Sequence, residues 1–297
     1  MAAQSGYLPV LLEITLDNIT GILVTLSYEF SFTRGSTKSG SEFIERLHTP
    51  SFEREPLNAY IGSGTITKFL EALEANTSLE KITIYGRHRS SAGWIDGIFG
   101  SMLSKTNIRD LTIYLEASID KDFKVATLVS SLDLERFSYR GTFKTSSPLI
   151  EALKFNGGLK AVNLSIGDFT PEKVFDDLTR YLFAHIPKIT LSISRANQLD
   201  SVARHLTNSV TQSLVIFENN PVDYTKFAQA LAHAPNLLSL NFQGIGRANG
   251  GMYMEPIFQA VAANTKLIMF ETSVFNRRDM VDLANMLKRN TTLENMK

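Results

Sequence analysis

A short apolar phrase recurs along most of this sequence. All but one copy opens with Leu or Ile, and apolar residues follow three and five positions later, as in L-x-x-L-x-L, except that Thr272 takes the third place after Leu267 and the copy at Leu293 is cut off after Met296. The opening positions are Leu79, Ile108, Leu134, Leu159, Ile186, Thr211, Leu237, Leu267 and Leu293. The gaps run from 25 residues after Leu134 to 30 residues after Leu237. Copies that stay in phase over such a distance predict an array of stacked repeats.

Each repeat combines one strand with one amphipathic helix. Alternation within the phrase sends every second side chain of the strand inward. Before the first phrase, residues 65–76 place four apolar side chains on one helical face, those of Ile66, Phe69, Leu70 and Leu73. One strand and one helix cannot bury such faces alone, so we expect stacked copies to share a continuous core.

Two residue types mark the turns. Asn lies where the helix ends in four copies, at Asn76, Asn156, Asn264 and Asn290. Because Asn tolerates the left-handed backbone conformation, we expect that conformation there. Gly follows the strand in four copies, at Gly86, Gly141, Gly167 and Gly244. We expect the conformational freedom of Gly to shape these strand exits.

With these long repeats, residues 57–297 resemble the ribonuclease-inhibitor-like class of leucine-rich-repeat proteins. The resemblance implies an α/β fold, a right-handed solenoid of about nine repeats with a parallel concave sheet and helices on the convex side. The Asn or Cys that this class places after the strand occurs here only as Asn219. Residues 282–293 also resemble the end of the repeat domain in tropomodulins. The degenerate repeats are similar to those of bacterial leucine-rich-repeat effectors.

Residues 1–56 do not follow the repeat. Two apolar stretches flank residues 17–21, and this pattern predicts a β-hairpin, followed by a short helix at 42–47. Because the end of a solenoid exposes its core, we interpret residues 1–56 as an N-terminal cap and residues 57–297 as the solenoid. Leu57 and Tyr60 are then expected in a degenerate first strand.

Composition narrows the class of partner. The 30 Lys and Arg residues balance 30 Asp and Glu residues, so the basic excess typical of nucleic-acid binders is missing. Cys is absent, which excludes disulfides and Cys-based zinc sites. No apolar run is long enough for a membrane span, and the start lacks the cationic region of a signal peptide. We expect a monomer that is cytoplasmic, or that is delivered into a host cell without a classical signal peptide.

No motif for catalysis or cofactor binding is recognisable. The five His residues lack metal-ligand spacing and are interpreted as surface polar residues, and Asp176 and Asp177 as solvated helix charges. The Gly clusters at 61–65 and 244–251 match neither a phosphate loop nor a dinucleotide fingerprint. We therefore expect no enzyme activity, no cofactor and no metal. An enzyme with an unrecognised site on a rim loop stays as a third alternative.

The expected binding surface is the concave face, where alternate strand residues point outward. Tyr and Arg are enriched at binding hot spots, so the predicted partner-binding strand residues are Tyr85, Tyr114, Arg136, Arg140 and Phe217. Two long strand-to-helix loops, 86–93 and 244–251, add Arg87, Arg89 and Arg247. Cationic loops on a neutral protein favour an acidic partner surface or a phosphate. A solvated sheet also needs polar and aromatic residues without any partner, and that alternative stays open.

From these patterns we expect a protein–protein interaction module. The effector resemblance implies a host protein as the partner, bound through the concave face and the rim loops. The alternative is an actin-binding module, which the tropomodulin resemblance implies.

Overall fold

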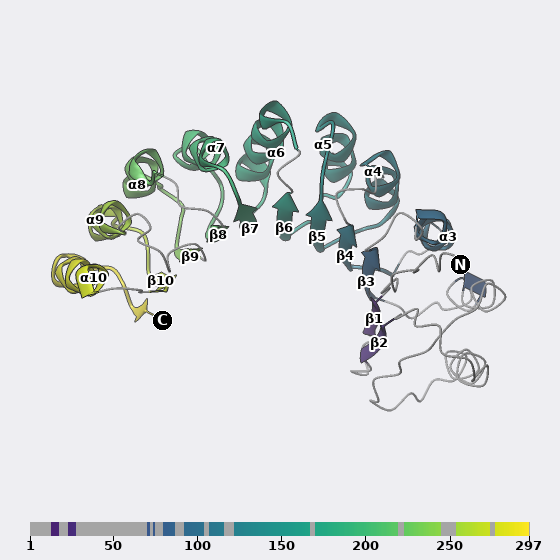
Figure 1. Ribbon diagram of the computed structural model, residues 1–297, viewed down its shortest axis with the longest axis horizontal. Helices are drawn as coiled ribbons and strands as arrows, with labels where there is room; N and C mark the ends of the chain where they lie inside the picture. The colour runs from purple at the N-terminus through teal and green to yellow at the C-terminus, as the bar shows by residue number, and fades with distance from the viewer. Residues whose placement is uncertain are drawn as a thin grey trace, which may run out of the picture. The chain divides into compact units, whose positions relative to one another are not determined.

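The computed structural model shows strands and helices that alternate along the chain (Figure 1). It describes residues 13–17, 23–27, 70, 71, 74, 80–86, 92–103, 107–115, 122–166, 170–218, 223–244, 254–273 and 277–296. The chain forms two compact units. The first comprises Met1–Gly141 with Glu151–Gly158, and the second comprises Thr142–Ile150 with Leu159–Lys297.

The first unit contains five strands in the order β2-β1-β3-β4-β5. Their bounds are β1 (Glu13–Asp17), β2 (Leu23–Ser27), β3 (Lys81–Gly86), β4 (Asp110–Leu115) and β5 (Arg136–Gly141), and the helices are α3 (Ala92–Met102) and α4 (Asp122–Ser131). Strands β3, β4 and β5 are parallel, whereas β1 is antiparallel to β2 and to β3. The predicted hairpin is therefore confirmed, and it joins the sheet directly at β3. Leu57 and Tyr60 lie outside the described residues.

The second unit contains six parallel strands that neighbour one another in chain order. The strands are β6 (Ala161–Ile166), β7 (Lys188–Ile193), β8 (Ser213–Glu218), β9 (Ser239–Gly244), β10 (Met269–Thr272) and β11 (Asn295–Met296). The helices between them are α6 (Glu172–His185), α7 (Ala196–Leu206), α8 (Thr225–Ala232), α9 (Glu255–Ala263) and α10 (Arg277–Arg289). Helix α5 (Ser147–Lys154) is divided between the units after Ile150. Within this unit the helices lie side by side on one face of the sheet (Figure 1). The alternation confirms the predicted α/β solenoid with a parallel sheet.

The repeat phrase supplies the core, as the spacing predicts. In the repeat that ends in β4, the side chains of Ile108, Leu111 and Ile113 are all fully buried. Alternate residues of the same strand are partly exposed, so the period of two separates a core face from an open face. The register keeps equivalent residues adjacent, with Leu111 opposite Ile82 on one side and Phe137 on the other.

Two polar residues at core positions of the phrase bond to the preceding repeat. Thr211 is the first residue of its phrase and is fully buried. Its hydroxyl donates to the carbonyl oxygen of Ile186 over 3.0 Å. Thr272 stands in the third apolar position and donates in the same way to the carbonyl oxygen of Phe242, 2.8 Å away. A buried hydroxyl with a partner costs little, and each of these bonds ties one repeat to the one before it.

The Asn residues at the helix ends act differently from our expectation. Asn264 has extended backbone angles, φ −74° and ψ 122°, so the predicted left-handed conformation is wrong there. Its amide nitrogen donates to the carbonyl oxygen of Leu231 in the preceding repeat, over 2.7 Å. Its side-chain oxygen accepts from the backbone nitrogen of Leu267, over 2.9 Å. Asn290 repeats both bonds, to Val261 and Leu293. Hydrogen bonds to the preceding repeat therefore account for the Asn at these two positions, and the backbone angles show that left-handed freedom is not the reason at Asn264.

Gly141 also has a reason other than the predicted one. Its backbone is not left-handed, but a Cβ atom added to it would clash with the hydroxyl oxygen of Tyr139. That tyrosine ring is almost fully buried, so it has little room to move away. The close approach of the ring requires Gly at this strand end.

We expect Gly141→Ala to lower the free energy of unfolding by about 1–3 kcal/mol, because the new methyl group overpacks the core. Urea denaturation followed by circular dichroism measures the change. The matched control is Gly157→Ala, where no heavy atom lies within 4 Å of the added Cβ. That control should stay within about 0.5 kcal/mol of the parent. Equal stabilities for the two variants would contradict the steric explanation.

Candidate protein-interaction surface

The open face of β3, β4 and β5 carries three rows of side chains across the strands. The rows follow from the register, in which each residue is paired with its equivalent on the next strand. They are Lys81, Asp110 and Arg136; Thr83, which is buried, Thr112 and Ser138; and Tyr114 and Arg140, with Tyr85 the backbone register partner of Tyr114. Neighbouring strands lie about 4.8 Å apart, so the members of one row are within reach of a single ligand group. We call the third row the Tyr–Arg row.

The charges of this surface are unequal in number and in exposure. Arg136 lies 3.5 Å from Asp110, and the side chain of Asp110 is only 18 % exposed against 65 % for Arg136. An ion pair that long and that exposed contributes little to stability. Arg140 is exposed and makes no hydrogen bond or ion pair with any residue that the structure describes. Lys81, Arg136 and Arg140 outnumber Asp110, so the surface carries excess positive charge.

The structure brings together some of the predicted partner-binding residues. Tyr114, Arg136 and Arg140 share the face described above, and Tyr85 pairs with Tyr114 in the same row. Phe217 belongs to the second unit, where its strand neighbours in register are Ser192 and Gln243. The loop residues Arg87, Arg89 and Arg247 lie outside the described part of the chain.

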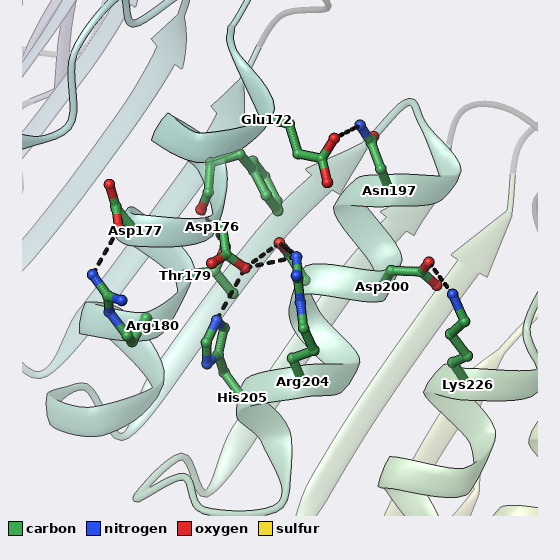
Figure 2. A network of polar contacts seen from close by, with 12 residues as sticks. Glu172, Asp176, Asp177, Thr179, Arg180, Asn197, Asp200, Arg204, His205 and Lys226 are labelled. Atoms are coloured by element: carbon green, nitrogen blue, oxygen red, sulfur yellow. Dashed lines mark hydrogen bonds and ion pairs between the residues drawn. The ribbon is translucent and has the colours of Figure 1, made fainter.

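A second polar cluster, which sequence analysis missed, links α6 and α7 in the second unit (Figure 2). The carboxylate of Asp176 accepts hydrogen bonds from the hydroxyl of Ser201 at 2.6 Å and from His205 Nε2 at 3.1 Å. Arg204 Nη2 lies 2.8 Å from the same oxygen. The interpretation of Asp176 as a merely solvated charge is therefore wrong. Ser201 and His205 follow Asp176 by about one repeat length in the sequence. That spacing is the signal from which the contact could have been predicted.

Competing effects set the pKa of Asp176. Burial by itself would raise the pKa, but the hydrogen bonds from Ser201 and His205 and the charge of Arg204 together hold it below the ordinary 3.8. Because the folded-state pKa is lowered, the stability that this cluster contributes is present above pH 3.8 and is lost as pH falls through the lowered value. The cluster is thus a charged link between two repeats at neutral pH.

The same cluster lacks the arrangement needed for nucleophilic catalysis. The Ser201 hydroxyl and the His205 imidazole both bond to one oxygen of Asp176. A catalytic serine instead needs the imidazole as its own hydrogen-bond partner. Asp177 points the other way, to Arg180 at 2.7 Å and to the hydroxyl of Ser146 at 3.3 Å (Figure 2). Both carboxylates therefore serve links between neighbouring elements.

An open depression of about 550 Å³ lies beside this cluster, over α6, α7 and α8. Its charged lining residues are Glu172, Asp200, Arg204 and Lys226. Lys226 pairs with Asp200 over 2.5 Å, Glu172 accepts from Asn197 over 3.0 Å, and Arg204 pairs with Asp176 (Figure 2). A ligand pocket usually offers polar groups that are not already engaged. We therefore assign no ligand to this depression.

Among the described residues, no group of His, Cys, Asp or Glu is arranged to hold a metal ion. Within those same ranges, no helix combines the length and the apolar character needed to cross a membrane.

The fold and the surface together define an α/β solenoid of strand–helix repeats with a cationic, aromatic strand face. Comparison of the sequence with known protein families and with curated proteins finds no match in either set.

Proposed function

We propose that this protein is a binding module without catalytic activity of its own, which recognises an acidic segment of another protein. The binding surface is the open face of β3, β4 and β5. The observation that carries the proposal is the Tyr–Arg row, in which Arg140 is exposed and has no partner among the described residues. An unpaired Arg next to Tyr in register is the pattern of an interaction hot spot.

The chemistry of the row suits an acidic partner. The planar guanidinium of Arg140 can bind a carboxylate or a phosphate through two parallel hydrogen bonds. The ring of Tyr114 supplies apolar contact area with little loss of conformational entropy on binding. The excess positive charge of Lys81 and Arg136 over Asp110 steers an acidic segment toward the row and raises the association rate.

We further propose that the repeats belong to the leucine-rich-repeat class and that the partner is a host-cell protein. The 25 to 30 residue spacing of the phrase and its L-x-x-L-x-L pattern support the class. The degenerate form of the repeats, similar to that of bacterial effectors, supports the host protein. In this proposal the protein acts as a monomer in a cytoplasm.

The experiment selects ligands and then tests the row. Peptides from a phage-displayed library are selected on the full chain, and the winners are measured by fluorescence anisotropy. We expect acidic winners, and we expect Arg140→Ala and Tyr114→Ala each to weaken their binding by about tenfold. The matched control is Lys188→Ala, which removes an exposed cation from β7 in the second unit and should change nothing.

Two outcomes would contradict the proposal. One is a set of winners without acidic bias. The other is equal affinity of the winning peptides for the parent chain and for the double variant Arg140→Ala, Tyr114→Ala. Circular dichroism of both proteins establishes that the variants keep their fold. The affinity should also fall as salt rises, because the attraction between exposed charges is screened.

A further inference from the structure

The open face of the second unit differs in chemistry from that of the first. The register of β6 to β10 sets its outward residues in three rows, which begin at Ala161, Asn163 and Ser165. The first two rows hold five residues each, one from every strand, and the third holds four, one from each of β6 to β9. All of them are at least partly exposed. Within this unit the strands lie inside the curve that helices α6 to α10 form (Figure 1). We call this surface the β6–β10 face.

The β6–β10 face is polar but almost without charge. Of its fourteen residues, eight are Ser, Thr, Asn or Gln, and only Lys188 and Glu271 are charged, with opposite signs. Helix α6, on the other side of the sheet, carries five charged residues in fourteen. A surface that serves solubility alone carries charged residues of both signs in larger numbers. Solvation therefore does not account for the composition of this face.

The polar side chains of the β6–β10 face are not engaged with the rest of the protein. Within the described ranges, none of the ten makes a hydrogen bond or an ion pair. On the helix side of the same repeats, by contrast, Glu172, Asp176 and Asp200 each bond to the next helix. A ligand site offers polar groups that are still free to bond, and this face does so.

Asn241, in the middle of the face, shows the same property most clearly. Its side-chain oxygen is shielded from water and accepts no hydrogen bond from any described residue. Such an oxygen costs free energy until a donor reaches it. Because the terminal torsion of Asn is broad, a small rotation of the amide turns this oxygen toward a ligand on the face.

The composition of the β6–β10 face disfavours three classes of ligand. Protein interfaces are depleted in Ser, and their hot spots are enriched in Trp, Tyr and Arg, none of which is among these fourteen residues. Nucleic acids and anionic membranes attract an excess of positive charge, whereas Lys188 and Glu271 cancel. A small ligand needs a pocket that encloses it, whereas this face extends over five strands.

We propose that the β6–β10 face binds a neutral oligosaccharide. A sugar hydroxyl both donates and accepts hydrogen bonds, and the hydroxyl and amide side chains of the face match it because they do the same. Phe217 lies between Ser192 and Gln243 in register. The C–H groups of a sugar pack on its ring, whose electron-rich face attracts their partial positive charge. Neighbouring strands are about 4.8 Å apart, so successive sugar units reach equivalent side chains of successive strands.

The test is an array of neutral and sulfated oligosaccharides probed with the full chain, followed by titration calorimetry with the neutral glycan that binds best. We expect neutral glycans to bind, with Phe217→Ala and Asn241→Leu each weakening the affinity by about tenfold. The affinity should stay constant as salt rises, because the ligand has no charge to screen. Phe123→Ala, at an exposed aromatic residue of α4, is the matched control and should leave the affinity unchanged.

Several results would overturn the proposal. These are binding of no neutral glycan, preference for sulfated glycans with a loss of affinity at high salt, and parental affinity in both variants. Circular dichroism establishes that the variants keep their fold. Uncharged peptides selected from the phage library that no longer bind Phe217→Ala, in a chain that binds no glycan, would assign the face to a protein segment. Arg140→Ala, in the first unit, should leave the glycan affinity unchanged, so the two binding surfaces are tested separately.

Discussion

Phe242→Ala is expected to lower the free energy of unfolding by about 3–5 kcal/mol, because it leaves a cavity that the surrounding residues cannot refill. Phe242 lies in the middle of β9 and is fully buried. Its ring meets Tyr224 edge-on at a centroid distance of 5.4 Å and stacks with Phe227 at 5.6 Å. Each such aromatic contact adds to the energy of burial alone, so the loss falls in the upper part of the range for core truncations.

Phe242→Ala should also change the order in which the repeats of the second unit unfold. Repeats contact only their neighbours, so a weakened repeat uncouples those on its two sides. Hydrogen exchange should therefore show β9 and β10 losing protection at lower denaturant than β7 and β8. Gln243→Ala, at the next position on the open face of β9, is the control and should leave both the midpoint and the protection pattern unchanged. A single transition at the parental midpoint in Phe242→Ala would contradict the argument.

The second large effect is expected at Asn264. Asn264→Ala should lower the free energy of unfolding by about 2–3 kcal/mol, because it takes the partner of the buried amide of Leu267 and one of the two partners of the Leu231 carbonyl, which still accepts from the amide of Ala234. Asn264 is only 2 % exposed, so water cannot replace the lost bonds without opening the structure.

A graded series tests this explanation. Asn290 makes the equivalent bonds in a partly buried setting, so Asn290→Ala should cost less than Asn264→Ala. Asn285→Ala, at an exposed position of α10, should change the stability by less than about 0.5 kcal/mol. Thermal or urea denaturation gives all three values. Equal losses at Asn264 and Asn285 would show that the bonds between repeats contribute nothing.

The sequence alone was sufficient to predict the strands, the hairpin and the core face, because each follows from a local period. The phrase predicts a core position for three residues of one repeat, and all three are buried: Ile108, Leu111 and Ile113. Strand β1 pairs with β2, as the turn residues between the two apolar stretches suggest. The reasons for Asn264 and Gly141 were predicted wrongly. Both depend on a neighbour, the Leu231 carbonyl and the Tyr139 hydroxyl, that backbone preferences do not reveal.

The candidate surface was predictable only in part. The spacing of the phrase aligns Tyr85, Tyr114 and Arg140, and the register confirms that alignment. The spacing of the phrase does not reveal which charges are already paired. Asp176 bonds to Ser201 and His205 because α6 and α7 are oriented so that these side chains meet, and the repeat period does not determine that orientation. The roles of Arg87, Arg89 and Arg247 stay predictions.

The antiparallel pairing of β1 with β3 makes this edge of the sheet different from the parallel pairs of the repeats. Head-to-tail association of repeat proteins into filaments requires that one end accept the other as if it were the next repeat. A parallel strand cannot take its usual place beside β3, because β1 already occupies that edge and runs the opposite way. Beyond β1 lies β2, again antiparallel, so the hydrogen-bonding pattern at this edge differs from that of every other strand pair in the first unit's repeats. A further strand–helix repeat therefore cannot pair with β3 in the parallel register that the repeats of this unit use among themselves.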